Sequence, residues 1–196
     1  MYDNTKIKIL EQIYLNPSIH KRELSKQLKL GMPSIDYGLQ KISQLIKQQK
    51  AGNQIQYFLD YSKEGLTPAL STVEYSRLER LPAKIKLSVR DFLNELKDKP
   101  LLALLFGSYA NNTYTKNSDL DILLVFQDVK DSKWIENTAK KISMKTNTRL
   151  NPVYLGYQEF KESFHNPTKE FFKKLKKDKI ILIGIEWWRQ LINEEA

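Results

Sequence analysis

One stretch, FGSYANNTYTKNSDLDILLVF (residues 106–126), constrains the fold of this chain more than any other. An apolar run, residues 101–106, ends at Gly107-Ser108, and ten residues then pass before Asp119 and Asp121. A second apolar run follows the second aspartate at once. Short apolar runs bounded by turn residues are typical of buried strands. The stretch therefore predicts a strand, a turn, and a second strand that begins beside two carboxylates.

The residue types in this stretch point to phosphate and metal chemistry. Gly107 lets the backbone approach a ligand closely and adopt unusual dihedral angles. Free N–H groups at the turn, together with the Ser108 hydroxyl, suit phosphate oxygens. Asp119 and Asp121, two positions apart on a strand, point to one face about 7 Å apart along the chain and can hold Mg²⁺. Neither feature is specific by itself, because Gly-Ser and Asp-x-Asp both occur widely.

The combination of these features is specific. Gly-Ser, ten residues, Asp-x-Asp and an apolar strand together resemble the signature of minimal nucleotidyltransferases in the polymerase-beta superfamily, over residues 98–160. The resemblance implies a small mixed sheet with helices. It also implies that Gly107 and Ser108 hold the triphosphate of an NTP. Asp119 and Asp121 would then be the catalytic residues and hold Mg²⁺, two ions in an active enzyme.

Two departures from the family signature concern the nucleotide and the metal. Where family members commonly carry Arg-Gly, this chain has Asn111-Asn112, and Lys116 is the candidate to replace the missing cation at the nucleotide. The third carboxylate of the family usually lies on a later strand. The candidate strand, residues 148–155, holds no Asp or Glu, and Asn151 takes that position as a metal ligand. An Asn can coordinate a metal through its carbonyl, but it brings no charge and cannot take a proton.

The N-terminal segment has a different pattern. Apolar residues at helical spacing predict three helices, over residues 5–15, 20–28 and 33 to about 48. A tight-turn signal at residues 50–54 leads into a returning strand, residues 55–60. Three short helices followed by a hairpin make a winged helix-turn-helix. The phrase HKRELSKQLKLGMPSIDYGLQKISQLIK resembles the helix-turn-helix of many small prokaryotic regulators, and the resemblance covers residues 1–60.

The third helix of such a domain lies in the major groove of double-stranded DNA. Five polar side chains on its outer face are predicted to meet bases and phosphates: Ser34, Tyr37, Gln40, Lys41 and Gln44. Asp36 lies near the same surface and would be repelled by phosphates. The alternative is a winged helix used for protein contacts or dimerisation.

The segment after the winged helix predicts a helical connector. Thr67-Pro68 is a helix-start signal, and apolar spacing predicts helices over residues 67–81 and 83–97. A connecting helix with an apolar face needs a partner, so this segment is also the candidate seam of a homodimer.

From residue 101 onward, short apolar runs alternate with helical stretches. The predicted strands are residues 101–106, 122–126, 149–155 and 180–183, and the predicted helices lie near 109–113, 132–146 and 167–177. Such alternation is typical of an α/β or α+β domain. The predicted organisation is a winged helix-turn-helix over residues 1–62, a helical connector over 63–98 and a nucleotidyltransferase-like domain over 99–196.

Charge and composition narrow the partners. The net charge of +9 is spread along the chain, which favours nucleic acid or other polyanions, or else a Lys-rich solubilising surface. The absence of Cys excludes disulfides and thiolate metal sites. No apolar stretch approaches the ~18 residues that span a bilayer, and the first residues lack the apolar core of a signal peptide. These features predict a cytoplasmic protein without a membrane partner.

Two functional hypotheses remain open. As an enzyme, the chain would transfer an NMP group from Mg-NTP to a hydroxyl of a protein, a nucleic acid or a small molecule. The alternative is a catalytically weak or inactive DNA-binding transcriptional regulator or antitoxin-type partner, whose C-terminal domain senses nucleotide. The intact Gly-Ser and Asp-x-Asp favour nucleotide binding in either case, and the missing third acid favours the alternative.

Overall fold

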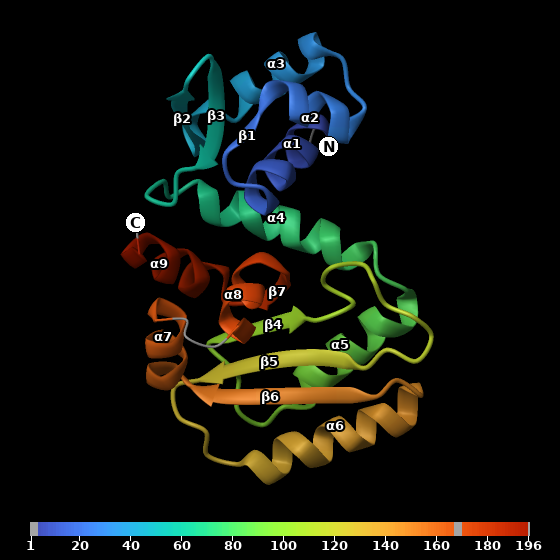
Figure 1. Cartoon of the computed structure of the whole chain (residues 1–196). Coiled ribbons are helices and arrows are strands. Elements are labelled where there is room, and N and C mark those ends of the chain that lie inside the picture. The colour runs from blue at the N-terminus through green and yellow to red at the C-terminus, as the bar shows by residue number, and fades with distance from the viewer. Residues whose placement is uncertain (1–3, 167–169, 196) are drawn as a thin grey trace. The chain divides into compact units, whose positions relative to one another are not determined.

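The computed structural model describes residues 4–166 and 170–195. The chain divides into two compact units, residues 1–73 and 74–196, and each is described by itself (Figure 1). None of the helices in the described residues is long and apolar enough to cross a membrane.

The first unit combines three helices with a small antiparallel sheet. Its elements are α1 (Asn4–Leu15), β1 (Ile19–His20), α2 (Lys21–Leu28), α3 (Met32–Lys41), a 3₁₀ turn (Ser43–Leu45), β2 (Ile46–Ala51) and β3 (Gln54–Leu59). The strand order is β1-β3-β2. Ile9 and Ile35 are fully buried between the helices. Gly38 lets α3 approach α1, because a Cβ there would lie 2.2 Å from Ile9 Cδ1.

The prediction that the third helix runs to about Gln48 is wrong. The helix ends at Lys41, and residues 46–51 form β2, which pairs with β3 from Ile46 opposite Leu59 to Ala51 opposite Gln54. Ile42, Leu45 and Ile46 have helical spacing, but the two-residue loop Gly52-Asn53 selects a hairpin. Pairing six residues with β3 satisfies the backbone groups that a longer helix would have used.

The second unit is built on a four-stranded mixed sheet. Its strands are β4 (Leu102–Phe106), β5 (Leu120–Phe126), β6 (Leu150–Gly156) and β7 (Lys179–Ile183), in the order β6-β5-β4-β7. The β5–β6 pair is parallel, and β4 is antiparallel to both β5 and β7. The strands lie where the apolar runs predicted them, and the sheet is mixed, as the family resemblance implied.

Helices cover both faces of this sheet (Figure 1). They are α5 (Ala83–Glu95), α6 (Ser132–Thr146), α7 (Tyr157–His165), α8 (Glu170–Lys177) and α9 (Ile185–Glu195). Helix α4 (Leu66–Glu79) crosses the boundary between the units, and its residues 74–79 belong to the second. The apolar side chains of α5 and α6 form one core with Leu120, Ile122 and Leu124 of β5. Because side chains alternate along a strand, Asp119 and Asp121 lie on the opposite face from α5 and α6.

Some helix predictions of this unit need correction. Residues 109–112 form turns and residue 113 is irregular, so the predicted helix is absent. Asn112 has a φ of 61°, and the Asn111 side chain accepts hydrogen bonds from the Thr113 backbone N–H and hydroxyl. The predicted helix over 167–177 corresponds to α8 from Glu170, and residues 167–169 lie outside the described residues. Helix α7 was not predicted.

The apolar face of the connector is buried within the chain. Ile85, Val89 and Phe92 of α5 are at most 4% exposed and belong to the core under the sheet. The physical reason given for a homodimer seam, an apolar helix face in need of a partner, is therefore already met for α5 inside the second unit.

Candidate functional site

The backbone at Gly107 touches the second aspartate. Phe106 at the end of β4 pairs with Asp121 on β5, so the turn that follows starts beside this carboxylate. Gly107 has a φ of +71°, in the left-handed region, and a Cβ on it would lie 2.5 Å from Asp121 Oδ2. Only glycine fits both requirements. The Gly-Ser turn and the Asp-x-Asp strand are thus parts of one site.

The turn after β4 leaves donors available. The carbonyl of Gly107 accepts from the N–H groups of Ala110 and Asn111, and the Ser108 carbonyl accepts from the Thr113 N–H. Among the described residues, the backbone N–H groups of Ser108 and Tyr109 and the Ser108 hydroxyl have no hydrogen-bond acceptor. A turn with a left-handed residue and consecutive free N–H groups is a concave anion site.

Asn151 faces the two aspartates from the neighbouring strand. Asp121 and Asn151 are register partners in the parallel β5–β6 pair, and Asn151 Nδ2 donates to Asp121 Oδ1 at 2.8 Å. Asp119 lies just before β5 and is 36% exposed. The structure therefore brings together four predicted residues: Gly107, Asp119, Asp121 and Asn151, with Ser108 following in the same turn.

The cation beside the carboxylates is Arg149, which the sequence analysis missed. Its guanidinium lies 3.6 Å from Asp119 Oδ2 and is 81% exposed. Lys116, the predicted replacement for the family's arginine, lies in an exposed loop and has no hydrogen bond or ion pair among the described residues. The signal for Arg149 was its position two residues before Asn151 in the predicted strand 149–155, since i and i+2 share a face.

The oxygen donors of this site fit a hard divalent cation. Two carboxylates and the carbonyl of the Asn151 amide are the ligand types that Mg²⁺ prefers. Within residues 4–166 and 170–195, no group of three His, Cys, Asp or Glu side chains lies close enough to hold a metal. The site offers two acidic ligands and one neutral ligand, so it fits a metal that keeps further coordination for phosphate oxygens and water.

A buried ion pair on α4 contacts the turn that follows Gly107. Arg77 and Glu74 are 8% and 2% exposed, and Arg77 Nη1 donates to Glu74 Oε2 at 2.9 Å. The same guanidinium donates to the carbonyl of Lys179 at 2.5 Å and to that of Ala110 at 3.4 Å. Arg77 therefore joins α4 to β7 and to the turn that carries Gly107. Sequence alone gave no signal for this contact, which spans 102 residues.

A buried lysine lies next to the same turn. Lys179 is 3% exposed and pairs with Phe106, the residue before Gly107. Its Nζ donates to the Lys176 carbonyl at 2.8 Å and lies 4.5 Å from the centre of the Trp188 ring. Burial lowers the pKa of Lys179 to about 8, and the neighbouring Glu74 carboxylate opposes this effect.

The outer face of α3 in the first unit is polar and exposed. Ser34, Tyr37, Gln40 and Lys41 are all exposed on it, and Lys41 Nζ lies 5.2 Å from the Tyr37 ring centre. Gln44 is exposed as well, but it lies in the 3₁₀ turn beyond the helix. Asp36 pairs with Lys21 at 2.5 Å, so its charge is partly compensated.

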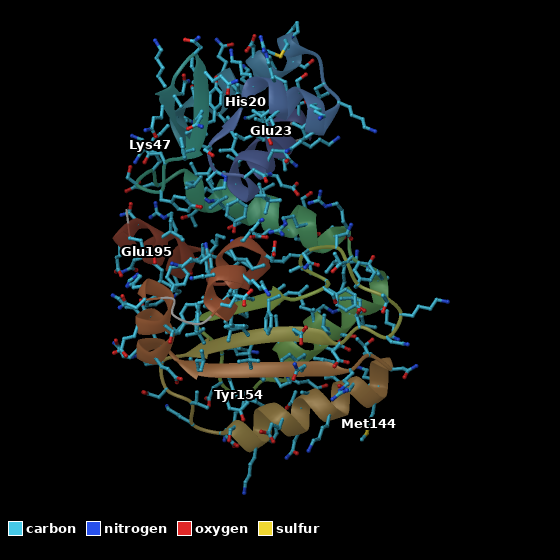
Figure 2. The ribbon with its side chains drawn as sticks, in the orientation of Figure 1. His20, Glu23, Lys47, Met144, Tyr154 and Glu195 are labelled. Carbon is cyan, nitrogen blue, oxygen red and sulfur yellow. The ribbon has the colours of Figure 1, made fainter. Side chains whose placement is uncertain are left out.

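Helix α2 of the same unit is capped by a histidine. Figure 2 shows His20 and Glu23, and His20 Nδ1 accepts a hydrogen bond from the Glu23 backbone N–H at the start of α2.

Comparison with known proteins places the second unit. The profile of the family described as "Nucleotidyltransferase domain" matches residues 88–193. Two curated proteins of Methanocaldococcus jannaschii, each named "Putative protein adenylyltransferase", are 33% identical to this chain. One match covers 72 residues, 35% of this chain and 73% of the relative, and the other covers 91 residues, 42% and 89%. A solved toxin–antitoxin structure with AMP-PNP is 19% identical over 58% of this chain and 86% of its own, with a TM-score of 0.41.

Proposed function

This chain belongs to the nucleotidyltransferase domain family, and on that premise we propose that its second unit transfers a nucleoside monophosphate, AMP in the first instance, from an NTP to a hydroxyl group. The observation that carries the proposal is the contact of Gly107 with Asp121, which joins a phosphate-binding turn to a pair of carboxylates. The names of the two relatives favour adenylate as the transferred group and a protein as the acceptor.

The residues of the site have distinct roles in this proposal. The Ser108 hydroxyl and the free N–H groups of the turn bind the β- and γ-phosphates and orient the leaving pyrophosphate. Asp119 and Asp121 hold Mg²⁺, with Asn151 as a neutral ligand. The bound metal would supply charge stabilisation for the phosphates and lower the pKa of the acceptor hydroxyl. Arg149, beside Asp119, provides the cation for the nucleotide, a role that the sequence predicted for Lys116.

The transfer balances as a single displacement. The acceptor oxygen forms a bond to the α-phosphorus, and the bond between that phosphorus and the oxygen bridging to the β-phosphorus breaks. The pyrophosphate leaves with the bonding electrons, and the hydroxyl proton passes to solvent. Asn151 has no basic atom for this proton. We therefore propose a slow transferase, and the nucleotide-sensing regulator or antitoxin-type partner remains the alternative.

Incubation with each of the four NTPs, labelled at the α-phosphate, tests the proposal. ATP with Mg²⁺ should label an acceptor protein or the chain itself, and EDTA should abolish the labelling. The double variant Asp119→Asn/Asp121→Asn keeps the shape of the site without its charge and should be silent. Binding of a fluorescent ATP analogue without any transfer would favour the sensing alternative. Labelling that persists in the double variant would contradict the assignment of the site.

For the first unit, we propose a winged helix-turn-helix that binds double-stranded DNA through α3. The supporting observation is the exposed polar face of α3, where Lys21 of α2 pairs with Asp36 and offsets its charge. Lys41 and Tyr37 would meet phosphate and base, while Lys50 on the β2–β3 hairpin would reach a flanking phosphate. Gln44 lies in the 3₁₀ turn beyond α3 and is exposed, so in this proposal it would meet DNA from the end of the helix.

A mobility shift with random double-stranded DNA tests this second proposal. Binding should weaken as salt increases, because phosphate contacts release counterions. Lys41→Glu should weaken it at least about tenfold. Lys6→Glu, on α1, is the matched charge control. Equal binding by both variants would contradict a role for α3.

A homodimer through the helical connector stays a prediction. Analytical ultracentrifugation of the full chain, which measures its mass in solution, tests it.

A further inference from the structure

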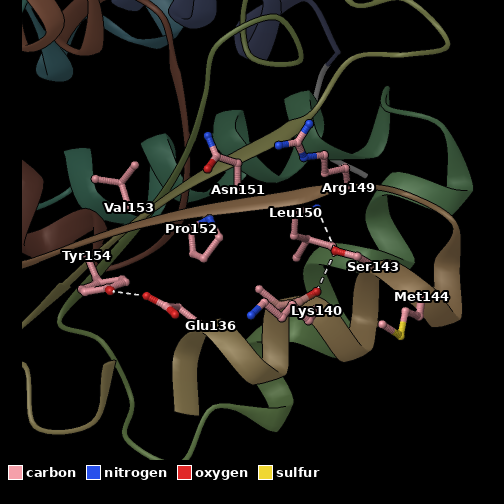
Figure 3. A pocket seen from close by; sticks show the side chains of 11 residues that line it. Glu136, Lys140, Ser143, Met144, Arg149, Leu150, Asn151, Pro152, Val153 and Tyr154 are labelled. Atoms are coloured by element: carbon pink, nitrogen blue, oxygen red, sulfur yellow. Dashed lines mark hydrogen bonds between the residues drawn. The ribbon is translucent and has the colours of Figure 1, made fainter. Parts of the chain in front are cut away.

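A groove runs along the open edge of the sheet in the second unit, between β6 and α6. Its volume is about 690 Å³. Figure 3 shows Arg149 and Asn151 on one side of β6, and Leu150 and Tyr154 on the other, facing α6. Because Asn151 bonds to Asp121, the groove begins at the candidate active site and leads away from it around the edge of the sheet.

The order of the strands decides which reactant comes near this groove. The phosphate-binding turn follows β4, the two carboxylates lie just before and on β5, and Asn151 is on β6. In an in-line displacement the attacking and leaving oxygens lie on opposite sides of the phosphorus. If the pyrophosphate leaves over β4, the acceptor hydroxyl arrives over β6. The groove therefore lies on the acceptor's side of the site.

We propose that this groove docks the acceptor as an acidic, partly apolar protein segment. The proposal rests on the transferase function proposed above and names the substrate class of that same site. The segment lies between β6 and α6 and passes a hydroxyl side chain across β6 to Asp119 and Asp121. Nucleic acid is the competing occupant and forms one arm of the test.

The charges in the groove favour an acidic occupant. On α6, Lys141 and Lys145 pair with Glu95 and Asp91 of α5, at 2.6 and 2.8 Å. Lys140, which lines the groove, has no ion pair among the described residues. Glu136, the acidic side chain of the groove, accepts a hydrogen bond from the Tyr154 hydroxyl at 2.8 Å. Arg149, which also lines the groove, lies 3.6 Å from Asp119 Oδ2, so Lys140 is the lining cation that the described residues leave available to an acidic occupant.

The apolar lining favours a protein segment. Met144 is 83% exposed, the largest value among the exposed apolar side chains of the chain's described part, and it borders the groove (Figure 2). Leu150, Pro152 and Val153 line the floor and the edge. Such a surface suits aliphatic side chains. Single-stranded nucleic acids are typically bound by aromatic stacking platforms in basic channels, and Tyr154 is the one aromatic ring that lines this groove.

The backbone of β6 excludes strand addition over its first half. The Arg149 carbonyl accepts from Leu120 on β5, so the alternate residues Leu150 and Pro152 turn their backbone groups outward. The Leu150 N–H is already bonded to Ser143 Oγ at 2.9 Å, and Pro152 has no N–H. The occupant is therefore held through side chains, and Lys140 and Met144 become the residues to change.

The test uses the full chain and a short fluorescein-labelled peptide of Glu, Leu and one Tyr, followed by fluorescence polarisation. Controls are the same peptide with Lys in place of Glu, and a labelled single-stranded oligonucleotide. The acidic peptide should bind in the absence of nucleotide. Lys140→Glu and Met144→Asp should each weaken binding about tenfold. Lys133→Glu, the same charge change on α6 outside the groove, should leave binding unchanged.

The outcomes separate this proposal from the transferase function. If the peptide binds in the groove and no NTP is consumed, the transferase proposal fails and the docking surface stands. If ATP labels an acceptor and Lys140→Glu does not raise the KM for that acceptor, the docking surface is wrong and the transferase stands. Binding by the oligonucleotide alone, equal weakening by Lys133→Glu, or no binding of the acidic peptide would each overturn the proposal.

Discussion

A Cβ on Gly107 would lie 2.5 Å from Asp121 Oδ2. The backbone of the turn after β4, which we propose binds phosphate, therefore lies directly against the carboxylate on β5, with no room for a side chain between them. The position also has a φ of +71°, which costs a non-glycine residue roughly 1–2 kcal/mol.

Gly107→Ala should therefore reduce transfer much more than it reduces stability. The added methyl group displaces the Asp121 carboxylate, and a displacement of that size can cost about 10²-fold in rate. We expect kcat/KM for ATP to fall by about that factor, while the thermal midpoint drops by a few degrees. Gly52→Ala, at a hairpin position with φ +58° and open space around it, is the control for backbone strain alone. Equal losses of activity in the two variants would contradict the contact.

Asn151→Asp should convert the site into one with three carboxylates. In EDTA, the new carboxylate replaces a hydrogen bond to Asp121 with repulsion, so the thermal midpoint should fall. Adding Mg²⁺ should raise the thermal midpoint of the variant by more than it raises the thermal midpoint of the natural chain.

The same variant tests whether a missing proton acceptor limits the rate. A positioned general base contributes about 10²-fold or more, so the transfer rate should rise by that order if the proton is the obstacle. Asn151→Ala, which lacks both amide and acid, should show no such gain. An unchanged rate in Asn151→Asp, with Mg²⁺ bound, would favour the nucleotide-sensing alternative.

Changes at Arg77 should separate positioning of the turn from stability. Arg77→Met removes the cation that faces Glu74, and breaking a buried ion pair typically costs about 3–5 kcal/mol. The double variant Glu74→Leu/Arg77→Met should recover most of this stability, because both charges are gone. It should still show a raised KM for ATP, since the Ala110 carbonyl has lost its donor. A KM equal to that of the natural chain would assign Arg77 to stability alone.

The stability of the second unit should depend on pH through Lys179. Its pKa is lowered to about 8 in the folded chain, from an ordinary value of 10.5. Between these values the unfolded chain binds more protons, so the contribution of Lys179 to stability rises with pH, by up to about 1.4 kcal/mol per unit. Below about pH 8 the cost of burying the charged ammonium is fully present.

Lys179→Met should remove this dependence. The free energy of unfolding of the natural chain, relative to the variant, should increase from pH 8 to pH 10.5 and stay level below pH 8. Urea denaturation of both chains across this range measures the difference and cancels the titration of other groups. A constant difference would show that Lys179 keeps its ordinary pKa when folded.

Local patterns predicted the strands of the second unit well, because buried strands need short apolar runs, and the apolar run 122–126 of β5 follows Asp121 without a break. They also placed Asn151 on the correct strand. They failed between Ile42 and Ile46, where apolar spacing fits both a helix and the start of a hairpin, and the pairing with β3 decides. Arg77 and Lys179 could not be found this way, since their contacts join residues far apart in sequence.

The position of Arg77 also bears on where a fragment that contains the complete second unit has to begin. The family profile starts at residue 88, yet the guanidinium that holds Ala110 and Lys179 comes from α4, before that point. A fragment that begins at residue 88 would keep every residue of the family signature. It would lose Arg77, whose guanidinium donates a hydrogen bond to Ala110 in the turn after Gly107. A fragment that keeps the Glu74–Arg77 pair and its contacts with Lys179 and Ala110 therefore starts no later than Glu74.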